Sequence, residues 1–308
     1  MDLNKVYNIN FLENDLLGKC ANLIIADPPY YKVKGEFDFI WKTFDDYLKD
    51  VEKWAIECKR LLADNGTLFW WGNSKKIAYS QIILDKYFNL ENSIVWRKID
   101  SMQYQYYSPD LARSFNTHNE RLLMYSNVND DDNTFAQYLR KKIEQHDIKH
   151  IEIQKLYPSK TGGLTGCVTN WLKGYNVMTE EQYNLLRKTF GNAIFDKDYN
   201  TLYAEYENTR RFFYNDLKLE EVFEFSQEGN ITKKYDHETK KPEKLTRAMI
   251  LTTSRKNDLV VVPFAGSGTE CAMAVKEQRN CIGFDIESKY VEMSNKRINE
   301  ILRQPKLF

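Results

Sequence analysis

The sequence predicts an α/β protein built on a parallel sheet with helices covering its faces. Strand patterns alternate with helix patterns over residues 1–98 and again over residues 235–308. This is the order that a parallel sheet needs, because a crossover between parallel strands usually takes a helix. In both regions a short apolar strand runs directly into a loop of unusual composition.

The N-terminal region is predicted to hold three strands and two helices. An apolar run over 21–26 predicts the first strand, and apolar residues at intervals of three and four predict a helix over 46–62. A turn at Asp64-Asn65-Gly66 separates that helix from a strand over 67–71. The remaining elements are a helix and a strand, around 75–86 and 93–96.

The middle of the chain, residues 99–230, has weaker periodicity. One clear strand over 121–125 is expected to join the sheet. We therefore divide the chain into a first half of the sheet over 1–126, an inserted region over 127–234 and a second half of the sheet over 235–308.

The C-terminal region returns to regular alternation. A helix is predicted over 243–254, after Pro242, and an apolar strand without polar alternation over 258–262. The elements expected beyond it are a helix, a strand and a final helix, over 269–278, 280–284 and 288–302.

Composition sets the broad class. The chain has 308 residues, of which 42% are apolar and 29% charged, so it can bury a substantial core and is not disordered as a whole. The longest uncharged apolar run, residues 259–265, is far short of the roughly 20 residues that span a bilayer. No secretory signal is visible, and the expected location is the cytoplasm. Five cysteines without a CxxC pair predict neither disulfides nor a metal site.

The charges are unevenly placed although 44 Lys and Arg balance 44 Asp and Glu. Residues 140–173 hold seven basic and three acidic side chains, and residues 230–256 hold eight and three. Between them, residues 196–228 hold four basic and nine acidic side chains. The neutral total is therefore compatible with basic surfaces that bind a polyanion, although such runs are also typical of solvated faces.

A glycine-rich turn follows the strand over 258–262. Its residues Phe264, Gly266, Ser267 and Gly268 lead into a helix at Thr269, and the next strand ends at Asp285. Glycines let a ligand approach the backbone, and an acid at the next strand tip can accept hydrogen bonds from a ribose. A Walker A loop would place Lys at position 269, and a dinucleotide fingerprint would place Gly at position 271, where the chain has Cys. S-adenosylmethionine, which carries adenosine without a pyrophosphate, fits this turn best.

A second motif, Asp27-Pro28-Pro29-Tyr30, ends the first strand. The prolines fix the chain direction, and the preceding carboxylate is held at the strand tip. A carboxylate and a backbone carbonyl can accept both hydrogens of one amino group, while Tyr30 offers a flat face to a planar base. A surface turn is the alternative for this motif alone, but it is disfavoured next to the glycine-rich turn.

Together these motifs resemble the DNA amino-methyltransferases, which methylate adenine N6 or cytosine N4 with S-adenosylmethionine. Asp27–Tyr30 precedes a long middle region, and Phe264–Gly268 comes last, which is the order of the permuted beta group of that family. The resemblance covers residues 8–126 and 235–300. It implies a Rossmann-like methyltransferase fold with an inserted target-recognition region, and direct in-line methyl transfer to a base flipped out of DNA.

The resemblance also implies roles for individual residues. Asp27 and the Pro28 carbonyl would hold the amino group, within a catalytic motif that includes Pro29, and Tyr30 would stack on the base. Residues 237–242 look like an H-x-T-x-K-P element that binds the methionine end of the cofactor, through Thr239 and Lys241. Residues 113–120 resemble a mobile segment near the base. The implied cofactor contacts in the turn and beyond it are Phe264, Gly266, Ser267, Gly268, Thr269 and Asp285.

Two positions depart from the family pattern: Val262 stands where Asp usually precedes Pro-Phe, and Asn10 where an Asp is expected before the first motif. Aspartate as the first residue of the motif favours adenine N6 over cytosine N4. An RNA or protein amide methyltransferase and a noncatalytic DNA-binding relic are the other readings. DNA is the expected partner, and both a homodimer and a cognate restriction endonuclease are compatible with the sequence.

Overall fold

The computed structural model describes residues 1–33, 36–99, 118–127, 133–159, 162–227 and 241–304. The chain forms two compact units. One comprises Met1–Asn127 together with Arg211–Phe308, and the other comprises Val128–Arg210.

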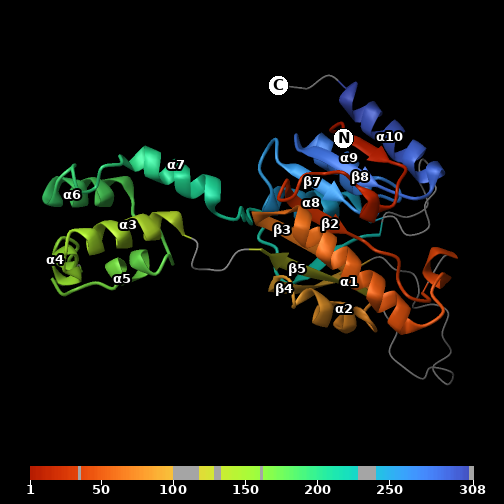
Figure 1. The fold of residues 1–308 in the computed structure, drawn as a ribbon, viewed down its shortest axis with the longest axis horizontal. Coiled ribbons are helices and arrows are strands. Elements are labelled where there is room, and N and C mark those ends of the chain that lie inside the picture. Colours follow the sequence, from red (N-terminus) through yellow and green to blue (C-terminus); the bar gives the residue numbers. More distant parts are fainter. Residues whose placement is uncertain (34–35, 100–117, 128–132, 160–161, 228–240, 305–308) are drawn as a thin grey trace. The chain divides into compact units, whose positions relative to one another are not determined.

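The first unit is built on an eight-stranded sheet among the described residues (Figure 1). Its order is β1 (Lys5–Tyr7), β8 (Asn280–Phe284), β7 (Leu259–Val262), β2 (Ala21–Ala26), β3 (Leu62–Gly72), β5 (Asn119–Ser126), β4 (Asn89–Lys98) and β6 (Val222–Phe225). Neighbouring strands are parallel except where β5 pairs antiparallel with β3 and β4. Among the predicted strands, the parallel arrangement is therefore confirmed for β2, β3, β4, β7 and β8, whereas β5 runs against them.

Helices cover both faces of this sheet. On one face lie α1 (Phe44–Leu61) and α2 (Ile77–Leu84), and on the other lie α8 (Glu243–Thr253), α9 (Thr269–Lys276) and α10 (Ser288–Leu302). Strand side chains alternate between the two cores: Ile24 packs with α1, and Leu23 with the α8–α10 layer. The part of the chain that the structure describes also has two 3-10 turns, η1 (Phe11–Glu13) and η2 (Glu36–Phe39).

Three details differ from the sequence prediction. Asp64-Asn65-Gly66 lies inside β3 rather than before it, and the pairing with β2 shifts there from Ala21–Leu62 to Leu23–Thr67. The strands β1 and β6 were not predicted; they are only three and four residues long and form the two edges of the sheet. The inserted unit ends at Arg210 rather than at residue 234, because β6 pairs with β4 in the sheet.

The second unit is helical and has its own core. It contains α3 (Thr134–Gln145), α4 (His150–Lys155), α5 (Cys167–Leu172), α6 (Glu180–Phe190) and α7 (Tyr199–Thr209). Tyr183, Phe195 and Leu202 are fully buried at its centre. None of the described helices of either unit combines the length and apolar character needed to cross a membrane.

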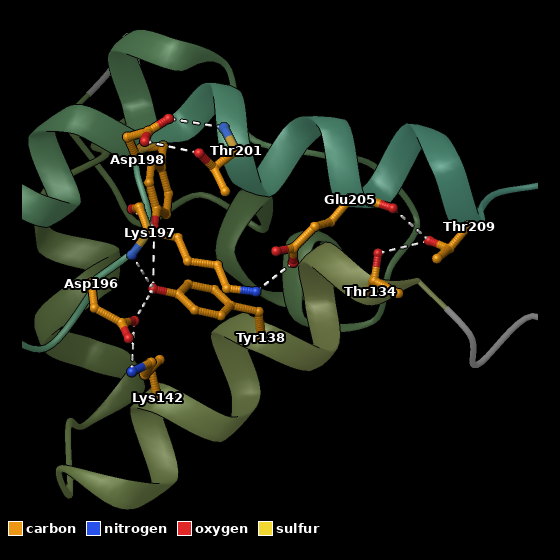
Figure 2. A network of polar contacts seen from close by, with 10 residues as sticks. Thr134, Tyr138, Lys142, Asp196, Lys197, Asp198, Thr201, Glu205 and Thr209 are labelled. Carbon is orange, nitrogen blue, oxygen red and sulfur yellow. Dashed lines mark hydrogen bonds and ion pairs between the residues drawn. The ribbon is translucent and has the colours of Figure 1, made fainter.

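A polar network ties α3 to the segment before α7 (Figure 2). The Tyr138 hydroxyl donates a hydrogen bond to Asp196 at 2.9 Å and accepts one from the Lys197 backbone N–H at 3.2 Å. Lys142 forms an ion pair with Asp196 at 2.7 Å, and Lys197 pairs with Glu205. Burial and the neighbouring Asp196 raise the pKa of Tyr138, so its hydroxyl keeps the proton that it donates.

Candidate active site

The two sequence motifs follow neighbouring parallel strands. Asp27–Tyr30 follows β2, Pro263–Gly268 follows β7, and β2 pairs with β7. From β2 the chain passes through α1 to β3, and from β7 it passes through α9 to β8 (Figure 1). These two connections leave the β2–β7 pair in opposite directions along the sheet, and their helices cover opposite faces. Ligands of open α/β sheets bind at the carboxyl ends of strands at such a switch point. Topology therefore brings together two segments more than 200 residues apart.

The Asp27 carboxylate is held from two sides. One oxygen accepts a hydrogen bond from the Tyr30 hydroxyl at 2.7 Å, and the other lies 2.7 Å from the Lys241 ammonium. Burial and the negative charge of Asp27 raise the pKa of Tyr30 well above its ordinary value, so the phenol stays protonated and donates. The motif thus fixes its own carboxylate, with help from a residue distant in sequence.

Lys241 belongs to a row of alternating charges made of Asp27, Lys241, Glu120 and Lys98. Its side chain is only 4% exposed, and its ammonium lies 3.1 Å from a Glu120 oxygen as well as 2.7 Å from Asp27. The other Glu120 oxygen pairs with Lys98 at 2.6 Å. Although burial opposes ionisation of both groups, the two carboxylates raise the pKa of Lys241, and the two ammonium groups lower the pKa of Glu120 to about 2. Lys241 and Glu120 are therefore both ionised at neutral pH.

The backbone after the prolines is also fixed. The Tyr30 N–H donates to the buried Asp38 carboxylate at 2.5 Å, and the Tyr31 carbonyl accepts a hydrogen bond from Lys76 at 2.7 Å. The Lys76 ammonium also lies 4.5 Å from the centroid of the Tyr31 ring, a cation–π distance. These contacts restrict the direction in which the Tyr30 side chain leaves the backbone.

The glycine-rich turn needs its glycines for two different reasons. Gly266 and Gly268 have φ of +47° and +69°, in the left-handed region that glycine adopts without steric cost. A Cβ on Gly268 would lie 2.6 Å from the Ser294 Cβ and 2.9 Å from its Cα, so α10 passes too closely for any side chain there. The Ser294 hydroxyl in turn donates to the Gly266 carbonyl at 3.1 Å.

Asp285 faces this turn from the end of β8. One carboxylate oxygen accepts from the Gly266 N–H at 2.8 Å, and the other accepts from the Glu287 N–H at 2.9 Å. Burial raises the pKa of Asp285, while the hydrogen bonds from the backbone favour its charged form. Each oxygen has a further lone pair, which suits hydroxyl donors such as those of a ribose.

The remaining residues of the turn are packed rather than open. Ser267 and Thr269 are buried with their hydroxyls 3.0 Å apart, and Arg297 donates to the Ser267 carbonyl at 3.3 Å and to the Thr269 hydroxyl at 3.0 Å. The Phe264 ring packs against Trp54, with centroids 4.9 Å apart, and against Phe11 at 6.2 Å.

Most of the predicted site residues therefore converge. Lys241, which the resemblance assigned to the cofactor, forms an ion pair with Asp27 of the predicted catalytic motif in this structure. Val262 is buried, and the Asn10 side chain caps η1 by accepting a hydrogen bond from the Leu12 N–H at 3.0 Å. Thr239 and residues 113–117 lie outside the described residues. The converging residues are Asp27, Pro28, Pro29, Tyr30, Lys241, Phe264, Gly266, Ser267, Gly268, Thr269 and Asp285.

Sequence reasoning missed several residues of the site. Glu120 stood at the end of the segment that resembles a mobile loop, but nothing in the local pattern pointed to its pairing with Lys241. Lys98, Asp38 and Arg297 likewise gave no local signal, because each reaches the site through tertiary contacts.

The geometry fits S-adenosylmethionine. The turn presents two positive-φ glycines and a backbone without side chains at those points, and Asp285 keeps acceptor capacity next to it. Asp27 and Tyr30 lie at the end of the adjacent strand, where a methyl group would have to be delivered. These residues would hold the adenosine and the methyl end of the cofactor, which supplies an activated methyl group on a sulfonium.

Comparisons with known proteins decide the family. A family model described as DNA methylase matches residues 21–296, which include both motifs. The chain belongs to this DNA methylase family. Membership and the architecture together establish an S-adenosylmethionine-dependent DNA methyltransferase with the fold expected from the sequence.

Individual relatives of this DNA methylase are distant but matched over most of their length. It is 24% identical to the Type II methyltransferase M1.MboII of Moraxella bovis, over 98% of both chains. It is 27% identical to the DNA adenine methyltransferase YhdJ of Escherichia coli K12, over 91% of this chain and 76% of YhdJ. Among solved structures, a DNA modification methylase of Thermus thermophilus, complexed with S-adenosyl-L-methionine, superposes with a TM-score of 0.54 at 14% identity, over 98% of this chain and 95% of that chain. The structural likeness supports the fold.

Proposed function

We propose that this DNA methylase transfers the methyl group of S-adenosylmethionine directly to N6 of an adenine that has left the DNA duplex. The observation that carries the proposal is the Asp27 carboxylate, held by Tyr30 and Lys241 at the tip of β2, beside the glycine-rich turn after β7. An acceptor for an amino group and a cradle for a nucleoside cofactor meet there.

The residues of the motif activate the amino group. The lone pair of an exocyclic amine is delocalised into the base, so the amine is a poor nucleophile. Asp27 and the Pro28 carbonyl would accept its two N–H groups and draw the nitrogen toward tetrahedral geometry, which restores the lone pair. Tyr30 would stack on the base, and Lys241 would keep the Asp27 carboxylate in place. No covalent intermediate is needed, and positioning supplies several kcal/mol of the barrier.

Aspartate at position 27 supports adenine as the base, and the E. coli relative is named a DNA adenine methyltransferase. Nucleoside analysis by mass spectrometry tests this assignment. Unmodified DNA is incubated with the protein and S-adenosylmethionine and then digested. We expect N6-methyldeoxyadenosine as the product. N4-methyldeoxycytidine would replace the assignment by the cytosine alternative, and transfer only to RNA or protein would reject DNA as the substrate.

Target recognition is proposed for the helical unit Val128–Arg210. The basic segment 140–173 lies in this unit, and binding of phosphates depends on Lys and Arg. Exchange of this unit for that of a relative with a known DNA site, followed by sequencing of the methylated DNA, tests the role. The hybrid should methylate at the relative's site, whereas retention of the original site would place recognition elsewhere.

We also propose a restriction-modification role, because the Moraxella relative is named a Type II methyltransferase. DNA methylated by this protein should resist one endonuclease from the same cells. Cleavage of methylated and unmethylated DNA at equal rates by every such endonuclease would oppose the role. We also propose the homodimer with which the sequence is compatible; sedimentation of the protein with and without DNA tests it, and a monomer under both conditions would reject it.

A further inference from the structure

Glu270 is a buried acid in the first turn of α9, directly after the glycine-rich turn. It is 6% exposed. Its own backbone N–H is the hydrogen-bond donor that reaches its carboxylate, and no ion pair joins it to another described side chain. A carboxylate that is buried without a cation is costly, so this side chain calls for a positively charged partner.

Within the described parts of the chain, the charged groups around Glu270 do not supply that partner. The strongest electrostatic neighbour is Asp27, which is also an anion. The two nearby cations have partners already: Lys241 pairs with Asp27 and Glu120, and Arg297 pairs with Glu243 and donates to the turn. The buried Cys281 thiol also faces Glu270, and burial raises its pKa, so it remains neutral. Val262, at the tip of β7, is apolar and adds no charge.

The position of Glu270 coincides with the expected path of the cofactor. Asp285 on β8 accepts from the turn, and Asp27 on β2 marks where the methyl group is delivered, with β7 between them. A cofactor whose ribose is held by Asp285 and whose methyl group is delivered beside Asp27 would have its amino-acid end near Asp27, because that end is attached to the sulfur that carries the methyl group. Glu270 follows the β7 turn and interacts most strongly with Asp27, so it lies near that end.

We propose that Glu270 binds the ammonium group of the cofactor's amino-acid end. This assignment rests on S-adenosylmethionine as the cofactor. The ammonium carries three N–H donors, which match the unused acceptor sites of a carboxylate, whereas the sulfonium has no donor. The ammonium also keeps its charge throughout methyl transfer, while the sulfonium loses its charge. An anion bound to the ammonium therefore strengthens binding without opposing the reaction.

Protonation of Glu270 gives the proposal a second consequence. Burial and the charge of Asp27 raise the pKa of Glu270 to about 7, so the free protein holds this carboxyl partly protonated at neutral pH. A bound ammonium favours the ionised form. Binding of S-adenosylmethionine should therefore release part of a proton near pH 7, and affinity should rise from pH 6 to about pH 7.5, below the range of roughly 7.7–8.0 in which an α-amino group loses its own proton.

Isothermal titration calorimetry without DNA tests the proposal in the full chain. The ligands are S-adenosylmethionine, S-adenosylhomocysteine, which keeps the ammonium but not the sulfonium, and 5′-methylthioadenosine, which lacks the amino-acid end. We expect Glu270→Gln to lower the affinity for S-adenosylmethionine and S-adenosylhomocysteine equally, by about tenfold or more, and to leave the affinity for 5′-methylthioadenosine within twofold of wild type. The matched control Glu292→Gln, an exposed acid on α10, should change none of them.

Two results would overturn the proposal: unchanged affinity of Glu270→Gln for S-adenosylhomocysteine, or a loss confined to S-adenosylmethionine. If the variant does not fold, titrations of the wild-type protein test the proposal instead. Titrations at pH 7 in buffers of different ionisation enthalpy should show greater proton release with S-adenosylmethionine than with 5′-methylthioadenosine, and equal release would reject the role. Because no DNA is present, this outcome is independent of whether adenine is the methylated base.

Discussion

Replacement of Gly268 by Ala tests how closely the glycine-rich turn packs on α10. At φ +69° an L-residue costs roughly 1–2 kcal/mol. The new Cβ would also lie 2.5 Å from the Ser294 hydroxyl oxygen, 2.6 Å from its Cβ and 2.9 Å from its Cα, so α10 or the turn must move. Such overpacking costs about 1–3 kcal/mol. We therefore expect the free energy of unfolding to fall by about 2–5 kcal/mol.

The same change should weaken cofactor binding, because Ser294 also holds the Gly266 carbonyl. Urea unfolding followed by tryptophan fluorescence measures the stability, and calorimetry measures binding of S-adenosylmethionine. Gly162→Ala is the control, since Gly162 has φ +82° and a methyl group added there would meet nothing within 4 Å. It should lose only the backbone contribution and bind the cofactor normally. If Gly268→Ala behaved like this control in both measurements, the steric argument would be refuted.

Three further predictions concern other contacts. The pKa of Glu120 is lowered to about 2 in the folded protein, against roughly 4.3 in the unfolded chain, so its ion pairs stabilise the fold by about 3 kcal/mol above about pH 4.3 and this stabilisation is lost as the pH falls toward 2. Glu120→Gln should flatten that part of the profile of stability against pH, and an unchanged slope would contradict the pairing. Asp285→Ala should weaken S-adenosylmethionine binding by roughly tenfold or more in calorimetry, and unchanged affinity would move the ribose contact elsewhere. Tyr138→Phe should reduce the stability of Val128–Arg210 by about 1–2 kcal/mol in urea unfolding without changing cofactor affinity, because its hydroxyl serves Asp196 and the Lys197 N–H.

The fold was predictable where local pattern and tertiary environment agree. The helix α1 carries its buried residues at helical spacing, and β7 and β8 are short apolar runs bounded by turns, so sequence and structure coincide there. The edge strands β1 and β6 are too short to show a period, and they are strands only because β8 and β4 offer unpaired edges. The Asp64-Asn65-Gly66 sequence has turn composition but is accommodated as an irregularity within β3.

The site was predictable where its functional residues are contiguous in the sequence. Asp27–Tyr30 and Phe264–Gly268 are such segments, and the pairing of β2 with β7 brings them together. The charges that hold Asp27 come from three separate places in the chain, so the row from Lys98 through Glu120 to Lys241 could be found only from the fold. Glu270 lies next to the glycine-rich turn in the sequence. Its burial, and the ion pairs that Lys241 and Arg297 form with other carboxylates, depend on tertiary structure and could not be predicted from the local sequence.

The most direct test of the central claim is methyl transfer by Asp27→Ala. Tritiated S-adenosylmethionine and unmodified DNA are incubated with the wild-type protein or the variant, and cofactor binding is measured in parallel. We predict that the variant binds the cofactor within a few-fold of wild type, while transfer to DNA falls by at least about a hundredfold, because the amino group loses its charged acceptor. Near-normal transfer by the variant would contradict the role of Asp27 and the proposed mechanism with it.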